Sequence, residues 1–266
     1  MDGDGFGLID LSDRPDILAR CDAARAEMDA FGYKPQTRIQ DLWQRGPAVR
    51  ALATLPEIME PLESYFGRRA IPFQTLNFKF GSQQEAHSDL IHFTPDPIHL
   101  MCGIWMALED VHPDAGPLFY YKGSHTWPVL TMQDAGAPAT VAPDQAYSTH
   151  YVPAMAAQLA ARAAKPSLAL VKKGQALIWA ANLVHGGTPR RDNHSTRYSQ
   201  VTHVFFEDSA YHTLMFERSG QRKHRLPRNI RTGQLAWPSL PQGQRIPLKT
   251  KLATLYHHLT RFTPSW

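Results

Sequence analysis

Short strand-like runs, divided by turns that contain Gly and Pro, fill the middle of this chain and limit the folds open to it. These runs are residues 71–80, 100–108, 118–121, 168–171, 176–181 and 198–206. The first run alternates between two sets of side chains, and 100–108 is almost wholly apolar, which is typical of a buried central strand. The turn Asp114-Ala115-Gly116-Pro117 favours a hairpin into the next run. Many short strands of this kind predict a mainly β fold with two packed sheets, a jelly roll.

Two segments before the strands have the features of helices. Residues 12–32 carry Pro15 in the predicted first turn, where a missing backbone N–H is harmless, and they end near a glycine. Residues 48–66 show apolar side chains at helical spacing but are interrupted by Pro56 and Pro61. We therefore expect helices that pack on the outside of the β core.

A chain of 266 residues with this pattern is expected to form a single domain. A helical N-terminal part would extend to about residue 70. A double-stranded β-helix core, jelly-roll and cupin-like, would cover residues 71–210, and a C-terminal extension would cover 211–266. Residues 131–146 lack periodicity and predict a long loop over the mouth of the core, followed by a helix over 151–164.

The overall composition is that of an ordinary globular protein, with 20% charged residues and a formal net charge of +4. No run of about 18 apolar residues is present, so we expect no membrane span. Residues 1–10 lack the features of a secretory signal, and the cytoplasm is the expected compartment. Cys21 and Cys102 are the only cysteines, and Cys102 lies in an apolar run that predicts a buried thiol.

Much of the excess positive charge lies in one stretch near the C-terminus. It consists of Arg218, Arg222, Lys223, Arg225, Arg228 and Arg231. A basic cluster attracts anions or nucleic acid, but no aromatic interleaving or nucleic-acid motif accompanies this one. The favoured interpretation is a solvated surface, and no nucleic-acid partner is expected.

His87-Ser88-Asp89 and the distant His185 are the candidate metal ligands. Residues i and i+2 of a strand project from the same face, so His87 and Asp89 can reach one ion while Ser88 points away. His185 ends an apolar run and precedes two glycines that permit close backbone approach. Two imidazoles and one carboxylate form the facial triad of non-haem Fe(II) oxygenases, which leaves coordination positions open.

A second His-x-Asp sequence occurs at His112-Pro113-Asp114. Its proline lacks a backbone donor and the following residues form a turn, so this pair is expected on the surface and not at a metal.

Arg197 and Ser199 indicate an acidic cosubstrate near the metal. They stand at positions i and i+2 of a predicted strand and therefore face the same interior. A guanidinium binds a carboxylate bidentately, and the hydroxyl of Ser199 adds a further hydrogen bond. Burying an arginine without an anion would be costly, which supports this interpretation.

Several blocks resemble the phytanoyl-CoA dioxygenase family when they are taken in order. The N-terminal blocks are His87-Ser88-Asp89, Gly103-Ile104-Trp105-Met106-Ala107-Leu108-Glu109-Asp110, Gly116-Pro117-Leu118 and Lys122-Gly123-Ser124-His125. The distal blocks are Lys173-Gly174-Gln175-Ala176-Leu177-Ile178-Trp179, His185-Gly186-Gly187 and Arg197-Tyr198-Ser199. The similarity covers about residues 73–206. No single block is specific for the family, but the order and spacing of all the blocks together are.

The resemblance implies a jelly roll that holds Fe(II) through His87, Asp89 and His185, with 2-oxoglutarate and O2 as cosubstrates. Arg197 would bind the distal carboxylate of 2-oxoglutarate, with Ser199 assisting. It also implies that Trp105 and Asn77 lie near the cosubstrate, although core packing and a hydrogen bond at the strand edge explain those two residues equally well.

One position departs from the family pattern. Some members carry a hydroxyl two residues after the distal histidine, where this chain has Gly187.

The expected reaction is hydroxylation of an unactivated C–H bond in a small-molecule metabolite, with release of succinate and CO2. Desaturation, epoxidation and ring formation stay open. Related halogenases replace the carboxylate ligand with a small residue that makes room for a halide. Because Asp89 fills that position, halogenation is not expected here. The substrate and the oligomeric state do not follow from the sequence.

Two other functions are compatible with the same barrel. The first is a cupin-like metalloenzyme, an isomerase or an O2-only dioxygenase, that does not use 2-oxoglutarate. The second is a non-catalytic jelly-roll binding module.

Overall fold

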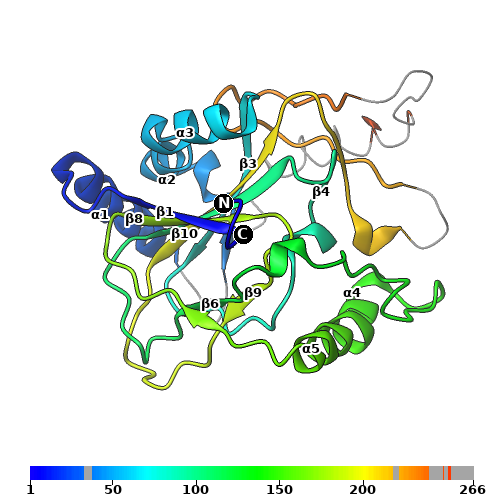
Figure 1. Ribbon diagram of the computed structural model, residues 1–266. Helices are drawn as coiled ribbons and strands as arrows, with labels where there is room; N and C mark the ends of the chain where they lie inside the picture. The colour runs from blue at the N-terminus through cyan, green and yellow to red at the C-terminus, as the bar shows by residue number, and fades with distance from the viewer. Residues whose placement is uncertain (33–37, 218–221, 240–247, 249–250, 253–266) are drawn as a thin grey trace.

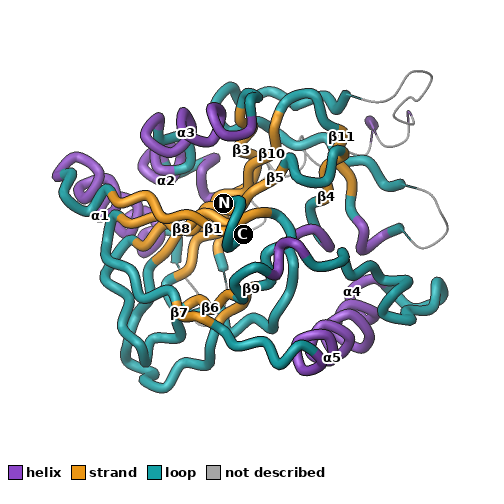
Figure 2. The backbone as a smooth tube through the Cα atoms, in the orientation of Figure 1, coloured by secondary structure: helices purple, strands orange, loops and turns teal. Residues whose placement is uncertain are grey.

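The computed structural model describes residues 1–32, 38–217, 222–239, 248 and 251–252. The described chain is mainly β, and its larger layer is a six-stranded antiparallel sheet (Figure 2). In spatial order the strands are β1 (Phe6–Asp10), β8 (Gln175–Ala180), β5 (Met101–Ala107), β10 (Ser199–Phe206), β3 (Ala70–Phe78) and β2 (Ile39–Gln40). β5 and β10 lie in the middle of this sheet, which confirms that residues 100–108 contain a buried central strand.

Two smaller sheets complete the β structure. One contains β7 (Ser167–Leu168), β6 (Leu118–Tyr120) and β9 (His185–Gly187), and the other contains β4 (Thr94–Asp96) and β11 (Ala210–His212). Because β6 pairs with β9 and β7, the turn at residues 114–117 does not close a hairpin with β5, and that expectation was wrong. The turn instead carries the chain from the large sheet to a small one, as consecutive strands of a jelly roll require.

Three N-terminal helices cover one face of the large sheet (Figure 1). They are α1 (Pro15–Ala30), α2 (Pro47–Leu52) and α3 (Pro56–Phe66). Each begins at a proline, where the fixed φ suits a first turn and no hydrogen bond is lost. The predicted interruption at Pro56 is therefore a boundary between two helices, whereas Pro61 lies inside α3.

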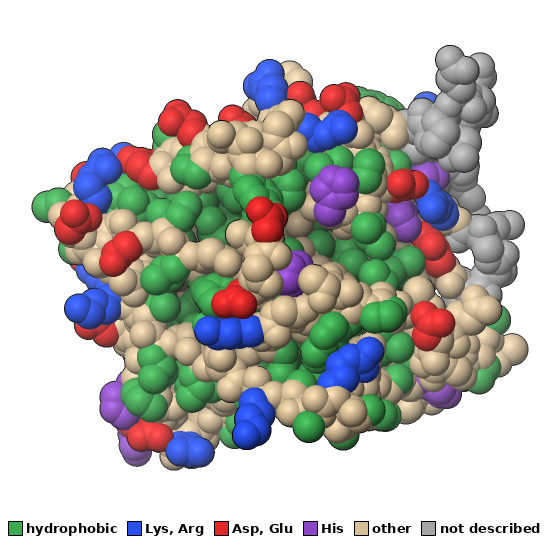
Figure 3. Space-filling model, in the orientation of Figure 1, with side chains coloured by type: hydrophobic (Ala, Val, Ile, Leu, Met, Phe, Trp, Pro, Cys, Tyr) green, Lys and Arg blue, Asp and Glu red, His purple; other side chains and the backbone are tan. Residues whose placement is uncertain are grey.

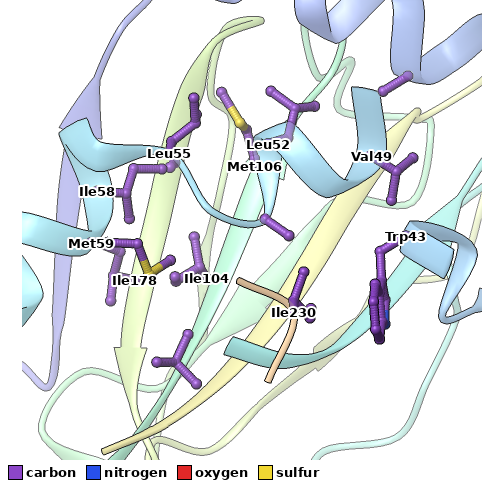
Figure 4. Packing of buried hydrophobic residues seen from close by; sticks show 14 of the residues in the cluster. Trp43, Val49, Leu52, Leu55, Ile58, Met59, Ile104, Met106, Ile178 and Ile230 are labelled. Atoms are coloured by element: carbon purple, nitrogen blue, oxygen red, sulfur yellow. The ribbon is translucent and has the colours of Figure 1, made fainter. Parts of the chain in front are cut away.

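The main core lies between these helices and the large sheet (Figure 4). Leu52, Ile58 and Met59 of the helices pack there against side chains of the strands, including Ile104 and Met106 of β5. The period of two along β5 places the side chain between these two, that of Trp105, on the opposite face and in a second core cluster. One face of the large sheet therefore stabilises the fold and the other is available for a site.

Gly103 of β5 allows a close approach between two strands on that second face. A Cβ atom at this position would lie 2.3 Å from Cε2 of Trp179 on β8. Such a distance is far inside van der Waals contact, so the indole of Trp179 occupies the space that any other residue at 103 would fill.

The segment after β6 is more helical than the sequence indicated. It contains α4 (Pro143–Ala146), a π-helical turn at Tyr147–Tyr151 and α5 (Val152–Ala161), so the helix expected from residue 151 begins at 143. In the described part of the chain, the 3₁₀ turns are Leu42–Gln44, Asp89–Ile91, Ser124–Thr126 and Leu214–Phe216.

Other expectations concern single side chains and the surface. Cys21 and Cys102 are both buried free thiols. Lys and Arg side chains are interspersed with acidic ones over the face shown in Figure 3. Among the described residues, no helix has the length and apolar character needed to cross a membrane.

Candidate active site

A cavity of about 450 Å³ lies between the large sheet and the β6–β9 sheet. Its walls include Leu76, Trp105 and Val201 from the large sheet and Leu118 and Gly186 from the small one. This volume falls in the range that is typical of sites for small molecules. All three candidate metal ligands line the same cavity.

The ligand atoms of His87, Asp89 and His185 converge, with every pair within 4.8 Å. Oδ1 of Asp89 lies 3.9 Å from Nε2 of His87 and 3.8 Å from Nε2 of His185. Three atoms this close together can surround one ion at bond lengths near about 2 Å after small shifts of the side chains. All three residues are buried, so the donor set and its geometry fit a divalent transition metal.

The backbone brings the two histidines together. His87 and His185 form an antiparallel bridge in which each backbone N–H donates to the carbonyl of the other, both at 2.9 Å. Residues that face each other in such a pair project from the same side, and their ring centroids lie 4.5 Å apart. Two ligands distant in sequence are therefore fixed by two main-chain hydrogen bonds.

Hydrogen bonds fix the tautomer of both imidazoles. Nδ1 of His87 donates to the carbonyl of Glu85 at 2.8 Å, and Nδ1 of His185 donates to that of Leu183 at 2.9 Å. Each Nε2 then keeps its lone pair, and that of His87 accepts a hydrogen bond from the side-chain amide of Gln84 at 3.2 Å. Burial lowers the pKa of both residues to about 4, which keeps the imidazoles in the neutral form that binds metals.

The local backbone at Asp89 differs from the strand that the sequence predicted. Ser88 is extended, but Asp89 starts a 3₁₀ turn whose N-cap is Ser88, with its Oγ accepting from the N–H of Leu90. The side chain of Ser88 also donates to the carbonyl of Ala181, away from the cavity. One extended residue is enough to place His87 and Asp89 on the same side.

The second oxygen of Asp89 is held by a residue to which the sequence analysis gave no role. Nε1 of Trp179 donates to Oδ2 of Asp89 at 2.7 Å, and Nε2 of His203 lies 3.6 Å from the same oxygen. Oδ1 faces the two histidines while Oδ2 is engaged by the indole. His203 could have been found from the sequence, because it stands in phase with Arg197 and Ser199 along a strand.

Replacing Trp179 with Phe is expected to weaken iron binding by roughly 10-fold, the lower end of the loss caused by removing a group that orients a metal ligand. The indole N–H that fixes Asp89 would be lost while an aromatic ring is kept. Equilibrium titration with Fe(II) under anaerobic conditions measures the effect.

Trp43→Phe is the matched control for this experiment. Nε1 of Trp43 also donates to a carboxylate, that of Asp41 at 3.3 Å, but neither residue lines the cavity. Equal losses of iron affinity in Trp179→Phe and Trp43→Phe would show that the indole of Trp179 has no specific role.

Arg197 lies in the wall of the cavity, with only 2% of its surface exposed. Its Nη1 donates to the carbonyl of Gly116 at 3.2 Å, and its guanidinium lies over the rings of Trp105 and Phe78. Nε1 of Trp105 is buried without a hydrogen-bond partner in the described part of the chain. A buried cation and an unused donor beside a metal site suit an anionic ligand.

Ser199 and Asn77 occupy different positions. Ser199 is on the same face of β10 as Val201, fully buried, and its Oγ donates to the carbonyl of Arg197 at 3.4 Å. Asn77 is on the opposite face of β3 from the cavity, and its amide donates to Gln200 at 3.1 Å. The side chain of Asn77 therefore does not reach the cavity, and we assign it no part in binding a cosubstrate.

The second His-x-Asp sequence lies on the surface, as expected. The side chains of His112 and Asp114 are 65% and 42% exposed. They offer no enclosed donor set.

The outer half of the cavity is formed by residues that the sequence did not assign to a site. The ring of His92 lies 5.2 Å from that of Tyr147, which belongs to the π-helical turn. Burial, followed by the charges of His87, Arg38 and Arg225, lowers the pKa of His92 to about 3. Arg225 is half-buried and lines the same cavity, so the interpretation of the basic stretch as solvated surface was wrong for this residue.

Several solved structures share this fold at low sequence identity. The epimerase SnoN, in complex with Fe3+, alpha ketoglutarate and nogalamycin RO, is 18% identical with a TM-score of 0.59, over 79% of this chain and 82% of that one. EctD from S. alaskensis is 18% identical with a TM-score of 0.54, over 77% and 74%. HygX from Streptomyces hygroscopicus with iron bound is 16% identical with a TM-score of 0.53, over 77% and 84%.

These likenesses establish the cupin-like jelly-roll fold. No curated protein sequence matches the chain. The profile of the phytanoyl-CoA dioxygenase (PhyH) family, however, matches residues 16–198, which is more than half of the chain and includes all three candidate metal ligands. The chain therefore belongs to the phytanoyl-CoA dioxygenase family of non-haem iron- and 2-oxoglutarate-dependent oxygenases.

Proposed function

We propose that this protein hydroxylates an unactivated C–H bond of a small-molecule substrate, with Fe(II) held by His87, Asp89 and His185. The observation that carries this proposal is the convergence of three buried ligand atoms within 4.8 Å of one another. The Nδ1 atoms of both imidazoles are already engaged, so only Nε2 is left to bind the ion.

Arg197 is the proposed anchor for the distal carboxylate of 2-oxoglutarate. Its guanidinium is buried and bonded on one side to the carbonyl of Gly116, and it is stacked against the indole of Trp105. Nε1 of Trp105 would donate to an oxygen of the same ligand, since this buried donor has no other partner among the described residues. Ser199 supports the backbone at Arg197 through its own hydrogen bond.

When bound, iron and 2-oxoglutarate supply the oxidising chemistry, which consumes O2 and releases succinate and CO2. The residues of this chain position the reactants and exclude water. Trp179 orients Asp89, and aromatic walls that include Phe93 and Trp105 surround the metal ligands. Such walls keep bulk water away from the reacting atoms.

Hydroxylation is the simplest outcome of this chemistry. An epimerase and a carbocyclase among the structural neighbours show that the same fold carries other outcomes.

We propose further that residues 1–266 act as one domain. Side chains of α1, α2 and α3, such as Ile17, Leu52 and Ile58, share one core cluster with Ile104 of β5. The helical part, the core and the described part of the C-terminal extension, which contributes Arg225 to the cavity, would then form one unit.

An anaerobic titration tests the proposed function directly. Fe(II) and 2-oxoglutarate, added in turn to the metal-free protein, are expected to produce a visible charge-transfer absorption band that neither produces alone. Exposure to O2 should then yield succinate.

The other two functions predict different results. A cupin-like enzyme that does not use 2-oxoglutarate would bind iron without the band, and a binding module would give neither the band nor succinate. Hydroxylation itself is confirmed by incorporation of ¹⁸O from O2 into the product, and unlabelled product would exclude it.

A further inference from the structure

Two arginines in the outer half of the cavity have no part in holding the metal or the cosubstrate. Arg225 and Arg38 both line the cavity. They come from distant parts of the chain but share the wall of this cavity with His92 and Tyr147.

Arg225 is fixed in place at the cavity wall. Its Nη1 donates to the carbonyl of His92 at 3.0 Å and to Oγ1 of Thr213 at 3.3 Å, and its guanidinium lies 4.9 Å from the centroid of the Phe93 ring. A half-buried guanidinium that is held by several contacts loses little freedom when it binds an anion.

Arg38 is an exposed residue that also lines the cavity. No described side chain forms a hydrogen bond or ion pair with its guanidinium, although Asp144 lines the same cavity. Tyr147 and His92 line the same cavity as Arg38. Arg38 is therefore a cation directed at the ligand space.

The charges of the cavity favour an anionic third reactant. Its described charged lining consists of Arg38, Arg197 and Arg225 against Asp89 and Asp144. The lining histidines His87, His92, His185 and His203 add no negative charge, so they do not offset these cations. A ferrous ion and the dianion 2-oxoglutarate cancel one another, so one positive charge is left over.

The positive charge of Arg225 lies apart from the proposed cosubstrate site at Arg197. The guanidinium of Arg197 lies over the rings of Trp105 and Phe78, whereas that of Arg225 lies over the ring of Phe93. From Asp89 the contacts lead outward through His203 (3.6 Å) and Phe93 (4.6 Å between rings) to Arg225 (4.9 Å from the Phe93 centroid). An anion at Arg225 thus lies beyond an aromatic ring from the metal, and it cannot be the group that chelates it.

We propose that Arg38 and Arg225 bind an anionic group, a carboxylate or a phosphate, of the substrate that is oxidised. The anion would lie at the outer end of the cavity, and the carbon skeleton would pass Phe93 and Tyr147 to reach the metal. This inference rests on the proposed function, in which Arg197 binds the distal carboxylate of 2-oxoglutarate and only Arg38 and Arg225 are left for the substrate.

The test uses full-length protein loaded anaerobically with Fe(II) and saturated with 2-oxoglutarate. Calorimetry measures the binding of phenylacetate, phenyl phosphate and inorganic phosphate, each titrated separately into this protein. Phenylacetamide, which is uncharged, is titrated in the same way for comparison. The anions are expected to bind at least about 10-fold more tightly than the amide, as for the gain of a charge-assisted hydrogen bond. Phenylacetate and phenyl phosphate distinguish a carboxylate site from a phosphate site.

Arg38→Gln and Arg225→Gln should each weaken anion binding by about 10-fold or more and leave binding of the amide unchanged. Arg222→Gln is the matched control, since Arg222 is exposed and paired with Asp96 at 2.6 Å. Circular dichroism confirms that each variant is folded.

Three results would overturn the proposal: no anion binds, the amide binds as tightly as the anions, or Arg38→Gln and Arg225→Gln retain wild-type anion affinity. Failure of the proposed function is recognised separately. In that case the charge-transfer band does not form, while metal-free Arg197→Ala protein still binds phosphate in a manner that depends on Arg38 and Arg225.

Discussion

Replacing Asp89 with Ala is expected to abolish 2-oxoglutarate turnover. The substitution removes the one carboxylate of the proposed metal site and leaves only the Nε2 atoms of His87 and His185. Loss of a group that merely orients a ligand costs 10- to 100-fold, so loss of the ligand itself should weaken iron binding by more than about 100-fold. Iron content after desalting, and succinate formed from 2-oxoglutarate, measure the two effects. His185→Ala should give the same result.

The chain supplies its own control for this prediction. His112→Ala and Asp114→Ala alter the second His-x-Asp sequence, which is exposed. Both variants should keep wild-type iron content and turnover. Full iron content and turnover in Asp89→Ala would refute the ligand assignment.

The fold should survive the Asp89 substitution. The indole N–H of Trp179 loses its acceptor, which costs about 1–3 kcal/mol, but a buried carboxylate is removed at the same time. Circular dichroism of the metal-free variant checks that lost activity does not reflect unfolding.

The second large effect is expected at Arg197. Arg197→Ala should raise the concentration of 2-oxoglutarate needed for half-maximal turnover by on the order of 100-fold, since losing one partner of a buried charge pair costs 2–5 kcal/mol. Iron affinity should stay unchanged, because Arg197 does not belong to the triad. The charge-transfer band, recorded as a function of 2-oxoglutarate, measures the change.

Arg191→Ala is the control for Arg197, because the Arg191 side chain is 82% exposed and only loosely paired with Asp114. Arg197→Lys should restore part of the affinity, since it returns the charge but not the planar fork of donors. An unchanged 2-oxoglutarate requirement in Arg197→Ala would move the carboxylate site elsewhere.

Periodicity was informative within strands but not between them. The alternation along residues 71–80 predicted β3 correctly, yet it could not tell which of its two faces the cavity would use. Gln74, Leu76 and Phe78 face the cavity, whereas Asn77 faces α2 through Gln200, whose amide donates to the carbonyl of Val49. The phase of an alternation is set by the layer that packs on it, and that layer is not encoded locally.

Turn residues likewise predicted a local feature but not the pairing of the strand that follows. The residues at 114–117 form a turn, but β6 pairs with β9 rather than with β5. A turn fixes the local direction of the chain, whereas the partner of the next strand depends on which sheet edge is open.

The sequence by itself determined the mainly β core, the positions of its longer strands along the chain and the types of side chain that a ferrous ion and a keto-diacid require. These follow from short-range patterns and from the chemistry of imidazole, carboxylate and guanidinium groups. Only the tertiary structure decided that the main-chain bridge joins His87 to His185, that Trp179 holds Asp89 and that Arg38 and Arg225 share one opening. The physical reason is that each of these contacts joins segments distant along the chain, and their separation is set by the packing of whole layers.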